Sequence, residues 1–141
     1  ARLTMSGVFD RSPTLRIAVF EGGVGWVPWL MRTLNHHTLG ESPGTTSVND
    51  FFRKRDKLKK PPSAYFDQIY VAAIAWEDYL PQVVQMWPNH NIIMGSDFDH
   101  GDAISTWPNT IAPIKAMKGI SEEDKEKILG GNAMRLFGIK G

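Results

Sequence analysis

The fold of this chain is constrained most by an alternation of short apolar segments with segments of helical periodicity. Residues 15–20 (LRIAVF) form a mostly apolar run, which Glu21-Gly22-Gly23 ends. Residues 91–94 (NIIM) form a second run, which Gly95-Ser96-Asp97 ends. Nearly continuous apolarity of this kind is typical of a strand covered on both faces, as in a parallel sheet. Residues 64–70 mix strand and helix signals, and we interpret them as a further strand.

Helical spacing of apolar residues predicts helices between and after these strands. Trp26, Trp29, Leu30 and Leu34 fall on one side of a helix over residues 26–37. Ser121 with Asp124 three residues later is typical of a capped helix start. The other predicted helices cover residues 47–58, 76–86, 108–118 and 121–129, with Gly130-Gly131 as an interruption before a last turn at 132–137. Strands that alternate with helices favour a parallel α/β fold.

The composition narrows the class of protein and of partner. The chain has 141 residues, 42% of them hydrophobic, which is enough for one core. Its 16 basic and 15 acidic residues give a net charge of +1, so we expect no nucleic acid and no membrane as partners. The basic residues concentrated at 53–60 are interpreted as a solvated helix face. The chain has no cysteine and its first residues lack the apolar core of a signal peptide, so we expect a cytoplasmic protein without thiolate chemistry.

Two acids follow the predicted strands directly. Glu21 comes after residues 15–20, and Asp97 comes three residues after residues 91–94. In parallel α/β folds, reactive side chains gather at the carboxyl ends of strands, so both acids are candidate catalytic residues. Asp is also common in turns after strands, and that reading stays open for both.

Histidine and tryptophan supply further candidates for the site. His100 follows Asp97 by three residues, and such a mixture of carboxylates and imidazole suits zinc, manganese or iron, although it lacks a third clear ligand. Trp107 precedes a helix-starting proline and could line a pocket. Trp26 fits helix packing and is a second candidate for substrate binding. His90 is interpreted as a loop residue.

Several stretches of the chain resemble the C-terminal part of the amidohydrolase-related family, in the branch of aminocarboxymuconate-semialdehyde decarboxylase and similar decarboxylases and hydrolases. In order, they are SGVFDRSPTLRIAVFEGGVGWVPWLMRTLNHH, KKPPSAYFDQIY, NIIMGSDFDHGD, WPNT and EEDKEKILGGNAMRLFGI. The Gly-Ser-Asp after an apolar strand and the terminal ILGGNAMRLF are the most specific of them.

The resemblance implies a fold, a cofactor and roles for the candidate residues. The fold would be a (β/α)8 TIM barrel around one divalent metal ion, zinc in preference to manganese, with residues 15–20, 64–70 and 91–94 as strands six to eight. Asp97 would be the strand-eight aspartate, which ligates the metal or orients and deprotonates the metal-bound water. Glu21 stands where many members place a histidine that acts on the substrate. His100 matches a pocket histidine of the pattern.

A TIM barrel needs ~250 residues, so 141 residues hold about three of its βα units. We therefore expect residues 1–141 to be the C-terminal part of one barrel domain whose N-terminal half is absent. The complete enzyme would hydrolyse a small-molecule substrate or decarboxylate it without oxidation, and the fragment alone would be inactive. The alternative is a catalytically silent structural or binding fragment. In either case we expect a partner chain, which is the missing half or a second copy.

Overall fold

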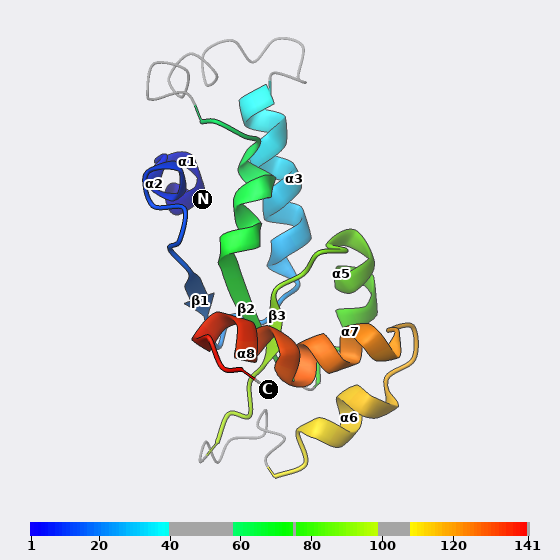
Figure 1. The fold of residues 1–141 in the computed structure, drawn as a ribbon. Coiled ribbons are helices and arrows are strands. Elements are labelled where there is room, and N and C mark those ends of the chain that lie inside the picture. Colours follow the sequence, from blue (N-terminus) through cyan, green and yellow to red (C-terminus); the bar gives the residue numbers. More distant parts are fainter. Residues whose placement is uncertain (40–57, 75, 99–107, 141) are drawn as a thin grey trace.

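The computed structural model describes residues 1–39, 58–74, 76–98 and 108–140. Within these residues three short strands, β1 (Ile17–Val19), β2 (Ile69–Ala73) and β3 (Ile92–Met94), form one sheet in the order β1-β2-β3 (Figure 1). Both pairings are parallel, with Ala18 opposite Tyr70 and Ala72 opposite Ile93. The mixed α/β class and the parallel sheet are confirmed. The outer edges of β1 and β3 pair with no further strand in the described residues.

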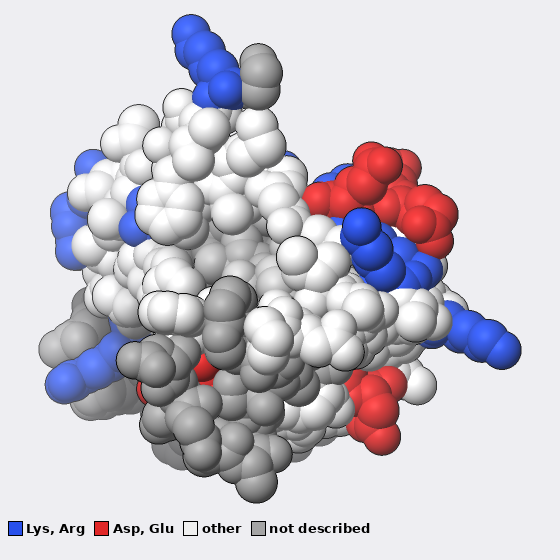
Figure 2. Space-filling model, turned by 90° about the horizontal axis from the view of Figure 1, so that it is seen from below, with Lys and Arg blue, Asp and Glu red and all other residues white. Residues whose placement is uncertain are grey.

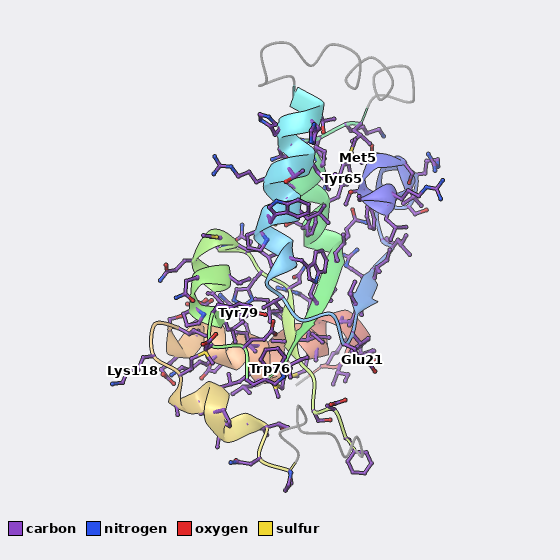
Figure 3. All side chains as sticks on the ribbon, turned by 180° about the vertical axis from the view of Figure 1, so that it is seen from behind. Met5, Glu21, Tyr65, Trp76, Tyr79 and Lys118 are labelled. Atoms are coloured by element: carbon purple, nitrogen blue, oxygen red, sulfur yellow. The ribbon has the colours of Figure 1, made fainter. Side chains whose placement is uncertain are left out.

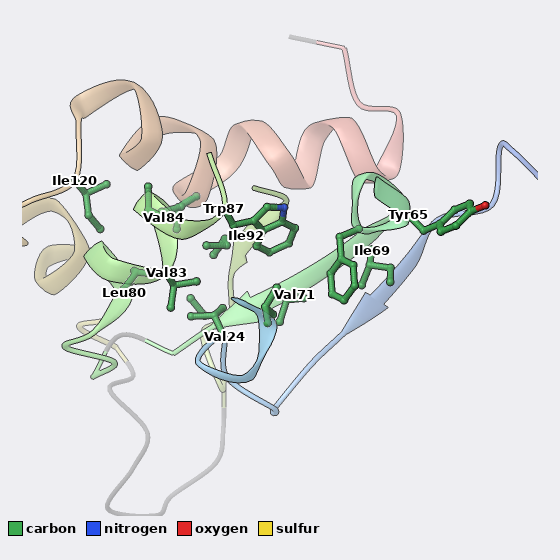
Figure 4. Close-up of a cluster of buried hydrophobic side chains, with 14 of the residues drawn as sticks. Val24, Tyr65, Ile69, Val71, Leu80, Val83, Val84, Trp87, Ile92 and Ile120 are labelled. Atoms are coloured by element: carbon green, nitrogen blue, oxygen red, sulfur yellow. The ribbon is translucent and has the colours of Figure 1, made fainter. Parts of the chain in front are cut away.

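The main core lies on the sheet face that carries Ile69, Val71 and Ala73, because successive side chains of a strand point to opposite faces. Helices α3 (Trp26–Leu39) and α5 (Leu80–Met86) pack against this face. Figure 4 shows how the side chains meet there. The buried residues drawn and labelled in it are Val24, Tyr65, Ile69, Val71, Leu80, Val83, Val84, Trp87, Ile92 and Ile120.

The opposite face of the sheet holds a much smaller cluster. Tyr70, Ala72 and Ile93 are buried there, and the partly buried Ala133 and Leu136 pack on them. These two residues belong to α8 (Asn132–Phe137), which lies in front of β2 and β3 in Figure 1. The remaining helices are α1 (Arg2–Met5), α2 (Val8–Arg11), the 3-10 helix η1 (Pro62–Gln68), α6 (Ile111–Ala116), α7 (Glu122–Glu126) and the π-helical turn η2 (Lys127–Gly131).

The prediction of a strand over residues 64–70 is wrong for most of its length. Residues 62–68 form η1, and β2 begins only at Ile69. Pro62 stands at the first helical position, where its fixed φ favours a helix, and Asn35 holds Ser63 through two side-chain hydrogen bonds. The branched residues that favour a strand begin at Ile69, after this turn is complete.

The predicted helices that fall within the described residues are confirmed with changed ends. The helix over 26–37 extends to Leu39, and that over 108–118 shrinks to α6. The helix over 76–86 begins only at Leu80, because the Glu77 N–H donates to the Ile74 carbonyl and the Leu80 N–H to the Glu77 carbonyl, which forms turns before the helix. Residues 47–57 of the predicted helix over 47–58 lie outside the described residues.

The predicted cap at Ser121 is confirmed. Its hydroxyl oxygen accepts a hydrogen bond from the Asp124 backbone N–H at 3.1 Å and starts α7. Gly130-Gly131 do not interrupt the helix as expected, since α7 continues through η2 into α8. The glycines fall in the π-helical turn, where the helix widens instead of ending. None of the helices in the described ranges combines the length and apolarity that a bilayer crossing requires.

Candidate active site at the carboxyl ends of the strands

A pocket of about 590 Å³ opens where the three strands end. All three strands contribute to it directly or through the residues that follow them. Its lining consists of Phe20, Glu21, Ala72, Ala73, Ile74, Trp76, Met94, Gly95, Ser96 and Asp97. Figure 3 shows Glu21 and Trp76 at this same end of the sheet. The structure therefore brings the two predicted catalytic acids, Glu21 and Asp97, into one pocket.

Both acids have an unusual backbone conformation. Glu21 has a φ of 60° and Asp97 a φ of 52°, and they are the non-glycine residues with positive φ in the described part of the chain. This left-handed region is sparsely populated by residues with a side chain, and such conformations concentrate at functional sites. Glu21 follows the end of β1 by two residues, and Asp97 follows the end of β3 by three. The pocket lining thus contains one acid in a left-handed conformation after β1 and another after β3.

The two acids flank the end of β2. Strand β2 lies between β1 and β3, and neighbouring strands are ~4.8 Å apart, so the two strand ends lie on the order of 10 Å from each other. Between them β2 contributes Ala72 and Ala73 to the lining of the pocket. The two acids therefore line one pocket on either side of the end of β2.

Two aromatic residues give the pocket an apolar side. Phe20 is 55% exposed and Trp76 is 50% exposed, although both are large hydrophobic residues. Exposed aromatic side chains beside a concave surface are typical of ligand contact. Helical spacing placed Trp76 in a helix, which is wrong because it lies in the turn between β2 and α5. Its position directly after a buried strand was the signal that could have identified it.

Seen from the carboxyl end, the coloured surface of the molecule is mostly uncharged in its middle and charged toward its rim (Figure 2). The lining of the pocket combines apolar residues, among them Phe20, Trp76 and Met94, with the acids Glu21 and Asp97, as ligand sites commonly do.

Glu77 is a third acid near this end, and sequence reasoning missed it. Its side chain is fully buried. Oε1 accepts hydrogen bonds from the Val24 N–H at 2.8 Å and the Tyr79 hydroxyl at 2.7 Å, and Oε2 accepts one from the Ile74 N–H at 2.9 Å. The hydrogen bond to Glu77 raises the pKa of Tyr79 to about 12. Like Glu21 and Asp97, Glu77 follows a strand closely, and that shared position was the available signal.

The other predicted site residues are placed differently. Trp26 is partly buried, donates from Nε1 to the Gly23 carbonyl at 2.9 Å and packs against Phe66. The described lining of the pocket does not include Trp26, so the structure does not bring it together with Glu21 and Asp97. His100 and Trp107 lie outside the described residues, and their role in substrate binding stays a prediction.

The site offers part of a metal-ligand set. Carboxylate oxygens are suitable ligands for divalent cations, and Asp97 and Glu21 present them in a shared pocket. A catalytic zinc site takes three protein ligands, whereas the described ranges contain no group of three or more His, Cys, Asp or Glu side chains that could hold a metal. Asp97 alone, or Asp97 with Glu21, would therefore supply a fraction of such a site.

Comparison with known proteins places these features in a family. The sequence profile of the amidohydrolases matches residues 1–139. A curated relative, the 2-amino-3-carboxymuconate-6-semialdehyde decarboxylase of Dictyostelium discoideum, is 26% identical over 140 residues, which cover 97% of this chain. The chain spans 35% of the length of that relative. Because the family profile covers nearly the whole chain, this protein belongs to the amidohydrolase family.

Proposed function

We propose that this chain is the C-terminal part of a metal-dependent amidohydrolase enzyme that hydrolyses or decarboxylates a small organic substrate. The observation that carries the proposal is the pocket at the carboxyl ends of three parallel strands, with Glu21 and Asp97 in left-handed conformations on its two sides. The active sites of TIM-barrel enzymes lie at this end of the strands. The relative from Dictyostelium discoideum is a decarboxylase, which supports the second of the two reactions.

Each pocket residue has a proposed role. Asp97 would ligate a divalent metal ion or accept a proton from water held beside it, because a carboxylate serves both purposes. The metal would supply Lewis-acid activation of water or of a substrate oxygen. Glu21 would act on the substrate as an acid or a base from the opposite side. Phe20 and Trp76 would hold the apolar part of the substrate, and His100 and Trp107 remain candidates for the same role.

The sheet edges support the proposal that more chain completes the domain. Strands β1 and β3 have unpaired outer edges in the described residues, and open edges favour pairing with further strands. By this proposal β1, β2 and β3 are strands six, seven and eight of a TIM barrel.

Assay of the complete protein tests the enzyme proposal. We expect turnover of small carboxylic acids with release of CO2, or of small esters and amides with release of acid. We further expect turnover to disappear on dialysis against a chelator and to return with added Zn²⁺ or Mn²⁺. Activity that survives removal of all metal would contradict the proposed metal dependence.

The second candidate is a catalytically silent fragment that requires a partner chain. The unpaired edges of β1 and β3 favour partner dependence, and the described residues alone supply few metal ligands. Zinc titration of the 141-residue chain, followed by calorimetry, separates it from an autonomous metalloenzyme. We expect no tight binding. Stoichiometric zinc binding by this chain alone would contradict the view that the other ligands lie elsewhere.

A further inference from the structure

Glu77 is a buried ionisable group that the proposed chemistry does not use. Burial of a carboxylate is strongly unfavourable unless hydrogen bonds replace its hydration. Glu77 is 0% exposed, and three donors, all of them neutral, replace the water around it. The buried carboxylate of Glu77 holds three donor groups in an arrangement that an apolar side chain could not hold.

The donors of Glu77 come from two separate loops. The Val24 N–H belongs to the loop between β1 and α3, 53 residues away in the sequence. The Ile74 N–H lies just after β2. The Tyr79 hydroxyl comes from the start of α5. One carboxylate therefore links the carboxyl end of β1 to the carboxyl end of β2.

The loop after β1 is shaped around this carboxylate. Gly23 has a φ of +58°, and a Cβ added to it would lie 2.6 Å from Glu77 Oε1. Only glycine meets both conditions, the left-handed conformation and the close approach. Gly23 stands two residues after Glu21, so the contact fixes the chain that carries the candidate acid. Trp76 is directly adjacent to Glu77 on the other loop.

We propose that Glu77 is a positioning residue, whose buried carboxylate clamps the β1–α3 loop to the end of β2 and thereby sets Glu21 and Trp76 against each other across the pocket. The proposal rests on the proposed function for its purpose, but its physical content is independent of it. Glutamine cannot replace it, because its amide –NH2 would face a donor where the carboxylate has an acceptor.

Amide hydrogen exchange in the complete protein tests the clamp directly. In E77Q we expect exchange at Val24 and Ile74 to accelerate at least about tenfold, while the Asp124 amide in the distant Ser121 cap keeps its rate. The matched control E126Q removes the same charge at an exposed position and should change neither. Unchanged exchange at Val24 and Ile74, or a uniform acceleration over the whole chain, would overturn the proposal.

A second variant decides the case if E77Q does not fold. Y79F removes one donor and leaves the carboxylate in place. Tyr79 and Val24 share Oε1, whereas Ile74 uses Oε2, so exchange should accelerate more at Val24 than at Ile74. Equal rates at Val24 in Y79F and in the wild-type chain would overturn the clamp.

Turnover by the complete enzyme tests whether the clamp acts through Glu21. We expect E77Q to lower kcat about 10- to 100-fold, and to have little further effect in an E21Q background. Equal fold-changes in the two backgrounds would indicate a general structural role and overturn the positioning role. Absence of turnover in the wild-type protein would contradict the proposed function instead, and the exchange measurement would then decide the clamp by itself.

Discussion

The two ends of the three-stranded sheet are built for different purposes. At the amino end, buried polar side chains form hydrogen bonds with the backbone. For example, Asn132 Nδ2 donates to the Ile92 carbonyl at 2.7 Å. Asn91 Nδ2 likewise donates to the Asp67 carbonyl at 2.9 Å. At the carboxyl end, Glu21 and Asp97 adopt strained conformations beside exposed aromatic residues. The first end stabilises the fold, and the second lines a pocket.

The difference between the two ends of the sheet indicates that stability and catalysis depend on different residues. In (β/α)8 barrels the amino face of the sheet serves stability and the carboxyl face serves catalysis. This division is already visible in three strands. This division predicts that substitutions at the amino end change the free energy of unfolding. Substitutions at the carboxyl end should instead change turnover.

The largest expected effect is the loss of activity in Asp97→Asn. Asparagine tolerates the left-handed conformation but cannot accept a proton as carboxylate does, so turnover by the complete enzyme should fall ~10³-fold or more. The free energy of unfolding should change by less than ~0.5 kcal/mol. Asp78→Asn, at an exposed acid that does not line the pocket, is the control and should keep full activity. Retained turnover in D97N would remove this residue from the mechanism.

At the amino end we expect the reverse pattern in Asn132→Ala. The substitution leaves the buried carbonyls of His90 and Ile92 without their donor. Unfolding free energy measured with denaturant should fall by about 2–3 kcal/mol, because buried acceptors without partners are costly. Activity per folded molecule should not change. Asn89→Ala, in an exposed loop, should have no effect on either quantity.

A smaller effect is expected for Trp76→Ala at the carboxyl end. The half-exposed indole contributes to the pocket and little to the core, so KM should rise about tenfold while the free energy of unfolding stays within ~0.5 kcal/mol. Trp29→Ala is the control, since Trp29 is 68% exposed on α3 and does not line this pocket. Equal KM values for W76A and the wild type would exclude Trp76 from substrate contact.

The smallest effect concerns the pH dependence of stability through His90. Burial lowers the pKa of His90, so below about pH 6.5 the unfolded state binds more protons than the folded state. Unfolding free energy should therefore decrease as the pH falls from 7.5 to 5.5, by at most about 1.4 kcal/mol per pH unit. His90 Nε2 lies 3.4 Å from Asp124 Oδ1, a contact that opposes the effect without cancelling it.

His90→Gln isolates this contribution. The difference between the wild-type chain and H90Q should vary over this pH range, and a constant difference would contradict it. The pKa of Asp124 is lowered, first by its hydrogen bond with Ser121, so its own contribution is lost only at more acidic pH. The contributions of His90 and Asp124 can thus be distinguished by the pH range in which the free energy of unfolding changes.

Sequence patterns predicted those parts of the molecule that depend on residues close together in the sequence. The strands at 15–20 and 91–94 followed from apolar runs with glycine turns, and the cap at Ser121 from a partner three residues away. The meeting of Glu21 and Asp97 followed from parallel topology, since carboxyl ends of parallel strands share one edge.

Features that depend on distant partners could not be predicted in the same way. Glu77 owes its burial to Val24, 53 residues earlier, and Asn132 binds Ile92, 40 residues earlier. His90, expected in a loop, is buried against Asn132 and Trp87. The residues adjacent to these polar side chains in the sequence do not indicate which distant residues will be their hydrogen-bond partners.

The position of a bound metal in the complete protein tests the central claim most directly. Anomalous diffraction from crystals grown with Zn²⁺ would locate the ion without reference to activity. The proposal predicts the peak in the pocket at the carboxyl ends of β1, β2 and β3, bound to Asp97 directly or through water. A peak confined to the amino end of the sheet or to surface histidines, with this pocket empty, would contradict the assignment of the carboxyl end as the active site.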